Sequence, residues 1–411
     1  MSDPIIGTSG SDVLTGDEGN DLIIGDGGQP SAPVVDPVAT VDPATMPVDP
    51  SVAVTVDPTV VAADPLTVVP SVDPAMQNAG SALPTLDAMV VPPAVPPVPI
   101  TPQGDDGNNN LIGTAVDETI RGGLGNDVID GGLGNDVMRG GFGDDQMIWN
   151  PKGGNDRVIG GAGNDESLIN AGADSEVFTL QATETGAQFA RAGDKPFTVD
   201  MSGTETVRLN ALDGDDQYRV AALAGTEVQT VRFDGGAGND LFDGSAANTT
   251  LVGKGGKGDD TLLGGTGDDV LRGNAGNDLF SGGAGDDVIR TGQGQDRIVY
   301  DTRDVFNPEA IGQDLIKDFQ EGDKIVLDKT TFKALTSEAG EGFSAASDFA
   351  VVGDASQVDS SEALIVYDKG SGSLFYNSNR AEQGLGRGGE EAFAIFADKP
   401  DIQADDFMVQ A

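Results

Sequence analysis

The amino-acid sequence predicts an all-β fold, a solenoid of short stacked strands, on three observations. Residues 255–299 divide without remainder into five nonapeptides, each with Gly at position four, Asp at position six and an apolar residue at position eight. The apolar residue at position eight is the centre of a short β-prone run at the end of each unit, as expected of a short strand that buries one side. The chain contains 60 Gly in 411 residues and only 5% aromatics, which is unlike an ordinary globular core. A short unit repeated at a fixed period cannot bury its apolar side alone, so the units are expected to stack.

The first six residues of each nonapeptide predict a tight turn that binds metal. Glycine permits positive φ and close backbone approach, so the turn can point its carbonyl groups inward. Asp at position six adds a hard anionic oxygen, the ligand type that calcium prefers. Two nonapeptides should complete one coil, so Asp260 is expected to stack on Asp278, and Asp269 on Asp287. Carboxylates stacked at the strand spacing of about 4.8 Å would repel one another, so the sequence predicts divalent cations between them.

These nonapeptides resemble the RTX (repeats-in-toxin) calcium-binding repeat, GGxGxDxUx, of hemolysin-type proteins. The resemblance is specific because the motif recurs in register. It implies a right-handed parallel β-roll that holds several Ca²⁺ ions between successive turns on both edges. The implied metal ligands are the position-six aspartates: Asp12, Asp21, Asp127, Asp136, Asp145, Asp156, Asp165, Asp240, Asp260, Asp269, Asp278, Asp287 and Asp296.

The composition excludes several classes of function. The net charge of -45 argues against nucleic acid as a partner. Such acidity is also typical of disorder or of a solvated surface, but the repeat position of many aspartates favours metal coordination. The chain contains neither Cys nor His, which excludes disulfides, thiolate metal sites, HExxH zinc centres and Ser-His-Asp triads. No apolar run reaches about 18 residues, so no membrane span is expected.

The N-terminal part combines two repeats with a Pro-rich segment. Residues 1–28 contain the nonapeptides GTSGSDVLT and GDEGNDLII, which are too few to be stable alone and should either dock on the later roll or be disordered. The first residues lack a basic and an apolar region, so no cleavable secretory signal is expected. Residues 29–103 repeat Val-Asp-Pro and predict a disordered, semi-rigid linker, with a docking segment as the alternative.

Residues 104–168 form the first predicted roll block. Its first two units are degenerate, with Asn109 and Glu118 in place of Asp, and are expected to cap the roll and bind calcium poorly. Trp149 and Asn150 are inserted between two units and should bulge one corner while the coil continues. Trp149 is expected to be an apolar plug at that corner, with a ligand-stacking platform as the alternative.

Residues 169–233 lose the nonapeptide but keep short β-prone runs, which predicts wider solenoid turns or a small β insertion. The stretch resembles segments between the calcium repeats of large bacterial RTX proteins. LDGDDQYRV, at 212–220, brings back a partial repeat with Asp216 at the aspartate position. The carboxylates Asp194, Asp200 and Glu205 could form a glycosidase-like pair, but carboxylates are common throughout this acidic chain.

Residues 234–299 form the second predicted block, in which Gly253 and Lys254 shift the register after a unit that lacks Asp. Residues 300–411 contain no nonapeptide and are expected to form a small antiparallel cap. DLIKDFQEGDKIVLD, at 314–328, resembles the segment that closes the roll in serralysin-type proteins. ALIVYDKGSGSLFYN, at 363–377, predicts a β-hairpin. The expected apolar side chains of the cap are Phe375, Tyr376, Phe393 and Phe396.

The last residues, ADDFMVQA, resemble the C-terminal signal of type I secretion substrates, and the alternative is a last strand of the cap. The sequence thus predicts an extracellular or cell-surface protein that folds on external calcium and acts as a matrix, coat or adhesion component. The expected partners are calcium, the type I secretion machinery and cell-surface polysaccharide or other copies of the chain. No enzymatic activity is expected, although residues 169–233 leave this open. The alternatives are a polysaccharide-acting or toxin-related exoprotein and a calcium-buffering export module that works with a partner.

Overall fold

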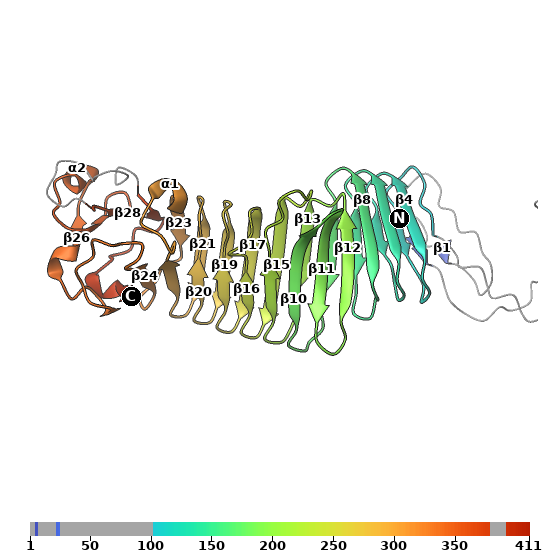
Figure 1. The fold of residues 1–411 in the computed structure, drawn as a ribbon, viewed down its shortest axis with the longest axis horizontal. Coiled ribbons are helices and arrows are strands. Elements are labelled where there is room, and N and C mark those ends of the chain that lie inside the picture. Colours follow the sequence, from blue (N-terminus) through green and yellow to red (C-terminus); the bar gives the residue numbers. More distant parts are fainter. Residues whose placement is uncertain (1–4, 7–21, 25–101, 379–391) are drawn as a thin grey trace, which may run out of the picture. The chain divides into compact units, whose positions relative to one another are not determined.

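A computed structural model describes residues 5–6, 22–24, 102–378 and 392–411. Its regular structure is almost entirely β-strand, arranged in a 16-stranded and a 14-stranded sheet whose neighbouring strands are mostly parallel. Figure 1 shows successive strands of the roll stacked side by side. Through most of the roll the chain alternates between the two sheets, so each coil adds one strand to each. The predicted all-β parallel solenoid is confirmed.

The five-nonapeptide run forms the most regular coils. Leu262 lies opposite Phe280 in the 14-stranded sheet, 18 residues further along the chain, so two nonapeptides complete one coil as expected. The position-eight residues, such as Leu271 and Ile289, are fully buried between the sheets. The strands of this run are β17 (Thr250–Lys257), β18 (Thr261–Leu263), β19 (Val270–Ala275), β20 (Leu279–Ser281), β21 (Val288–Gln293) and β22 (Arg297–Tyr300).

The first block builds the same coil around one insertion. Met138 lies opposite Val158, 20 residues later, and Trp149 fills the extra space. The Trp149 ring is 5% exposed and stacks on Phe197 at 3.7 Å between centroids, which confirms the apolar plug. The strands are β3 (Asn110–Ile112), β4 (Thr119–Leu124), β5 (Val128–Asp130), β6 (Val137–Phe142), β7 (Gln146–Trp149), β8 (Asp156–Ala162) and β9 (Glu166–Asn170).

Residues 169–233 combine both predicted alternatives. In the 14-stranded sheet three strands, β10 (Val177–Thr183), β11 (Gly186–Ala192) and β12 (Phe197–Ser202), pair antiparallel with one another between β8 and β14 (Gln217–Val220). The 16-stranded sheet continues with parallel strands alone. These are β13 (Thr206–Asn210) and β15 (Thr230–Ala237), while β16 (Leu241–Asp243) resumes the parallel order of the other sheet.

The stacked strands continue past residue 299, where the nonapeptides end. DLIKDF, which was expected to lead into antiparallel strands, itself contributes β23 (Asp314–Lys317), parallel to β21, and β24 (Lys324–Asp328) is parallel to β22. Each sheet continues with one further parallel strand. Strand β29 (Ala394–Phe396) pairs with β23, and β30 (Phe407–Gln410) pairs with β24. The C-terminal residues therefore form the last strand of the cap.

Antiparallel pairing, expected for the cap, joins its outer strands. The predicted hairpin is confirmed as β27 (Ile365–Asp368) and β28 (Ser373–Tyr376), with β26 (Phe349–Val352) parallel to β27 and β25 (Gly340–Glu341) antiparallel to β30. Two four-residue helices, α1 (Pro308–Ile311) and α2 (Ala355–Val358), lie in the cap. Three of the four expected aromatic side chains are buried in the main core, and Phe375 packs against a second small cluster.

Of the N-terminal part, the described residues 5–6 and 22–24 extend the 16-stranded sheet. Strand β1 (Ile5–Ile6) pairs with β2 (Leu22–Ile24), and β2 pairs with β3, all in parallel. Asp12, Asp21 and the Pro-rich linker up to residue 101 lie outside the described residues. None of the helices that the structure describes is long or apolar enough to cross a membrane.

Candidate calcium sites

The position-six aspartates form hydrogen-bonded ladders along the two edges of the roll. The backbone N–H of Asp260 donates to Oδ1 of Asp278 at 2.9 Å, and that of Asp269 donates to Oδ1 of Asp287 at 2.8 Å. Each bond joins one coil to the next because the partners are 18 residues apart. The predicted stacking of aspartates two nonapeptides apart is therefore confirmed.

Each ladder precedes the strands of one sheet and is interrupted once. The ladder of the 14-stranded sheet breaks at the antiparallel insertion; its members are Glu118, Asp136 and Asp156, followed by Glu176, Asp216, Asp240, Asp260, Asp278, Asp296 and Asp323. The ladder of the 16-stranded sheet is interrupted over the coils of β15 and β17, where Gln229 and Thr249 stand in place of Asp. Its members are Asn109, Asp127, Asp145, Asp165 and Glu205, followed by Asp269, Asp287 and Asp314.

The second carboxylate oxygen of most ladder aspartates is buried without a hydrogen-bond partner among the described residues. This holds for Oδ2 of Asp127, Asp136, Asp145, Asp165, Asp216, Asp240, Asp260, Asp278, Asp287 and Asp296. Asp269 differs, because its Oδ2 accepts from the backbone N–H of Gly265. An unpaired buried carboxylate oxygen costs several kcal/mol, on the order of the penalty for an unsatisfied charged group. The repetition of this feature along both edges points to a bound cation.

The glycine at position one leaves the space that such a cation needs. A Cβ atom on Gly122 would lie 2.6 Å from the carbonyl oxygen of Gly140, in the next coil, and still closer to Oδ2 of Asp127. A Cβ on Gly273 would lie 2.6 Å from the Thr291 carbonyl oxygen and still closer to Oδ2 of Asp278. An Asp Oδ2 and a carbonyl oxygen of the next coil thus converge in a cradle beside each of these two glycines, and oxygen ligands of this kind suit Ca²⁺.

This geometry refines the role of the repeated glycines. In the unit that begins at Gly122, positions two and four adopt positive φ, +119° at Gly123 and +102° at Gly125, as a tight turn requires. Gly122 itself is not in that region, and it is needed because any side chain would fill the cradle. The repeat pattern predicts that all these glycines serve the turn. It does not predict that position one must also lack a side chain.

Burial sets the electrostatics of the ladders. Desolvation raises the pKa of Asp127 and Asp260 to about 7, that of Asp278 to about 6 and that of Asp287 to about 8. Hydrogen bonds from the stacked backbone N–H groups oppose this rise, and neighbouring carboxylates add to it for Asp127, Asp260 and Asp287. A divalent cation at the cradle would favour the ionised form of each carboxylate.

The ligands would be mostly backbone oxygens. Within the described ranges, no three carboxylates gather closely enough to hold a metal by themselves. The cradles beside Gly122, Gly140, Gly235 and Gly273 therefore offer an Asp Oδ2 and a carbonyl oxygen from the next coil, consistent with the oxygen-only ligand sets of calcium.

Glu176, Glu205, Asp314 and Asp323 are ladder members that were not predicted from the sequence, whereas Asn109 and Glu118 were expected as degenerate members. Asn109 and Glu118 are integral to the ladders, but both carboxylate oxygens of Glu118 accept hydrogen bonds from Thr114, so its turn has no unpaired oxygen. Asp314 could have been found, because GQDLIK at 312–317 matches positions four to nine of the repeat. Asp323 was not recognised because Gly322 directly precedes it. In the nonapeptides one residue separates the position-four Gly from the position-six Asp.

A second, exposed ladder uses the side chains at position five. The backbone N–H of Asn277 donates to Oδ1 of Asp259 at 2.7 Å, and that of Asp144 donates to Oδ1 of Asn126 at 2.9 Å. Asn and Asp serve equally here because only the acceptor oxygen is used. Part of the acidity of the chain is therefore structural and lies outside the cradles.

The three carboxylates considered for a glycosidase-like pair have different environments. Asp194 is exposed in the turn between β11 and β12, and Asp200 accepts from Gln188 on the outer surface at 2.8 Å. Glu205 belongs to the ladder, where it accepts from the backbone N–H of Asp165. Their contacts explain each of them without a shared site.

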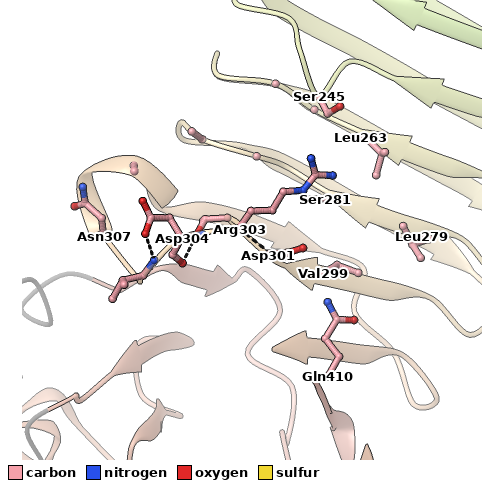
Figure 2. Close-up of a pocket in the computed structure, with 17 residues that line it drawn as sticks. Ser245, Leu263, Leu279, Ser281, Val299, Asp301, Arg303, Asp304, Asn307 and Gln410 are labelled. Carbon is pink, nitrogen blue, oxygen red and sulfur yellow. Dashed lines mark hydrogen bonds between the residues drawn. The ribbon is translucent and has the colours of Figure 1, made fainter. Parts of the chain in front are cut away.

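A separate cavity of about 540 Å³ lies where the roll meets the cap. Its lining includes Leu263, Leu279 and Val299 from the outer face of the 14-stranded sheet. Figure 2 shows Arg303 extending from the neighbouring loop toward Ser281. The loop is held by its own hydrogen bonds, including one from the Arg303 backbone N–H to Asp301. The ionisable side chains of this lining are partly or fully exposed, unlike those of the cradles.

A parallel β-roll with buried carboxylate ladders on both edges defines a class, the calcium-binding repeat solenoids. The family model described as the RTX calcium-binding nonapeptide repeat (4 copies) matches residues 1–30, 112–147, 152–175, 232–251, 254–289 and 263–298. The chain belongs to this family of RTX calcium-binding repeat proteins. The matches do not reach the cap, so the serralysin-like closure and the secretion signal stay predictions. No curated protein matches the chain.

Proposed function

We propose that this protein is a secreted calcium-binding β-roll that folds on extracellular calcium and serves as a structural component of a matrix, coat or cell surface. The observation that carries the proposal is the row of buried Oδ2 atoms without partners, most of them beside a position-one glycine. A bound Ca²⁺ would supply the positive charge that lets these carboxylates stay ionised in the folded roll.

The residues of the chain would couple metal binding to folding. In the unfolded chain the aspartates are solvated and the glycine-rich segments have high conformational entropy. In the folded roll, Asp278 must stack beneath Asp260 and lose its water, which raises its pKa. At neutral pH without a cation, this desolvation opposes folding, so metal-binding free energy becomes folding free energy.

The secretion part of the proposal rests on the same coupling. A chain that stays unfolded at low internal calcium suits passage through a narrow export channel. Extracellular calcium modules have dissociation constants on the order of 10⁻⁴–10⁻³ M, so the cradles would fill only outside the cell. The type I secretion machinery is the proposed exporter, and β30 would then have a second role as its signal.

The direct test is a calcium titration of the full-length chain followed by far-UV circular dichroism. The proposal expects little strand signal in a calcium-free buffer, a cooperative gain as calcium rises into the millimolar range, and loss of that gain on adding EDTA. Magnesium is the matched control, because its stricter octahedral geometry and reluctant dehydration make it a poor fit to cradles of backbone oxygens. A strand signal unchanged by EDTA would refute the coupling.

The structural role is tested separately from calcium binding. Calcium-loaded protein should bind to cell surfaces or assemble with itself, and sedimentation with and without cells measures both. We propose no enzymatic activity for the calcium-binding roll, and a product screen with polysaccharides tests residues 169–233, for which the sequence leaves activity open.

A further inference from the structure

Four basic side chains form a continuous row on the outer face of the 16-stranded sheet. Lys254 lies opposite Arg272, Arg272 opposite Arg290, and Arg290 opposite Lys317, on the neighbouring strands β17, β19, β21 and β23. Arg272 and Arg290 are exposed, and the two lysines are half-buried. The whole chain has 23 Lys and Arg against 68 Asp and Glu, so four adjacent cations are not expected from its composition.

The positive charge of this row is only partly compensated. Lys254 pairs with Asp234 at 2.9 Å, and Arg290 pairs with Asp318 at 3.4 Å. Among the described residues no ion pair involves Arg272 or Lys317. Like charges directly opposite one another on neighbouring strands are destabilising. The row therefore works against the stability of the sheet, which calls for a purpose outside the folded chain.

An apolar row runs beside the basic one. Val252, Val270, Val288 and Leu315 are also opposite one another, two residues before the basic side chains on the same strands, and all are half-buried. Arg232, exposed on β15, extends this second row. The outer face thus presents one cation per strand beside a low apolar strip, repeated at the strand spacing of about 4.8 Å.

We propose that this face binds a linear acidic polysaccharide, a polymer with a carboxylate on successive sugar units, laid across strands β17 to β23. The planar guanidinium groups of Arg272 and Arg290 can each make a bidentate contact with a carboxylate. A polymer is favoured over a small anion because the charges repeat along a line. This inference rests on the proposed function, since the row exists only in the folded, calcium-loaded roll.

Single-stranded nucleic acid fits this face less well. Its binding usually relies on aromatic side chains that stack with the bases, and the outward residues of β17, β19, β21 and β23 include none.

The test compares full-length wild type with the double variant Arg272→Gln/Arg290→Gln in excess calcium. The matched control is Arg121→Gln/Arg139→Gln, which removes two exposed arginines that are also directly opposite, but on the other sheet. Calorimetry with short oligogalacturonates is the measurement, with neutral dextran oligomers and a single-stranded oligonucleotide as comparison ligands. Wild type and the control variant should bind the oligogalacturonate, and the affinity of the Arg272/Arg290 variant should fall by about tenfold or more.

The outcomes separate this proposal from the proposed function. Circular dichroism in calcium should show that all three proteins fold, and if wild type does not, both proposals fail. If all fold, equal binding by the two double variants, no binding by wild type, or tighter binding of the oligonucleotide overturns the polysaccharide proposal alone. The polysaccharide proposal is also overturned if Arg272→Gln/Arg290→Gln changes only the calcium concentration at the midpoint of folding. The basic row would then only balance the negative charge of the ladders.

Discussion

Asp260 and Asp278 are joined by a 2.9 Å hydrogen bond from the backbone N–H of the first to Oδ1 of the second, while Oδ2 of Asp278 is buried without a partner among the described residues. One carboxylate thus has two tasks. Its Oδ1 fixes the stacking of successive coils, and its Oδ2 is left for a cation. Folding and calcium binding are coupled at this side chain, and substitutions can separate the two tasks.

Asp278→Asn should make the calcium-free roll more stable and its calcium binding weaker. The amide keeps an acceptor for the Asp260 N–H but removes a charge that burial disfavours. Because burial raises the pKa of Asp278 to about 6, we expect the calcium-free free energy of unfolding to rise by about 1–2 kcal/mol. The calcium midpoint should shift upward by roughly tenfold for the cradle concerned, since ligand charge sets calcium affinity. Urea unfolding and calcium titrations measure the two effects.

The matched control is Asp259→Asn, in the exposed ladder. Asp259 accepts from the Asn277 N–H, and an asparagine already fills the equivalent place in the next coil. This variant should leave the calcium midpoint almost unchanged. If both variants shift the midpoint equally, overall charge and not the cradle governs calcium binding.

Gly273→Ala should abolish calcium binding at one cradle, and circular dichroism in excess calcium checks that the coil still folds with the new Cβ beside the Thr291 backbone. The new Cβ would lie 2.6 Å from the Thr291 carbonyl oxygen and closer still to Oδ2 of Asp278, where the ion is expected. Isothermal titration of the folded protein should show about one fewer equivalent of calcium than wild type. Gly172→Ala is the control, because its Cβ would meet nothing nearer than 3.5 Å. Unchanged stoichiometry in Gly273→Ala would place the ion elsewhere.

Acid should partly replace calcium. The ladder carboxyls have raised pKa values in the folded roll, about 7 for Asp260 and about 8 for Asp287, against about 3.9 in an unfolded chain. The folded state therefore binds more protons than the unfolded state between these values. Its stability without calcium is fully present below pH 4 and is lost as the pH rises toward 8.

The measurement is circular dichroism of calcium-stripped protein from pH 8 to pH 5, where the strand signal should increase. Added sodium chloride at pH 8 is the control, because it screens the overall repulsion without protonating buried carboxyls. A salt effect as large as the pH effect would assign the change to net charge alone.

The regular coils could be predicted because the residues that specify them lie close together in the sequence. The period of the buried position-eight residues, such as Leu262 and Phe280, sets which strands can stack, and the turn glycines set the coil length. The antiparallel strands β10 to β12 were not predicted in detail. Their pairing, for example Leu180 opposite Phe189, depends on contacts that no repeat specifies.

The candidate sites were predicted in part. The ladder aspartates follow from the motif, but Asp314 and Asp323 lie where the glycine spacing changes, and their place is fixed by stacking on Asp287 and Asp296. The row from Lys254 to Lys317 is spread over 64 residues of sequence and becomes a surface only through the parallel register. Repeat position alone did not reveal it.

Trp149 should report the formation of the first block, and Phe197→Ala should weaken it. Trp149 is the only tryptophan, and its indole N–H donates to the Gly154 carbonyl oxygen while its ring stacks on Phe197 from the inserted strands. Its fluorescence should therefore shift to the blue as calcium is added. Removing the Phe197 ring, 6% exposed, should cost about 3 kcal/mol.

Because a solenoid can unfold locally, this loss should move the fluorescence transition to higher calcium more than the circular dichroism transition. Phe142→Ala removes a ring that is 64% exposed and should change neither. Equal shifts of both signals in Phe197→Ala would mean that the roll folds as one cooperative unit. The inserted strands would then be coupled to the distant coils of β17 to β22 through the continuous core and not only to their own corner.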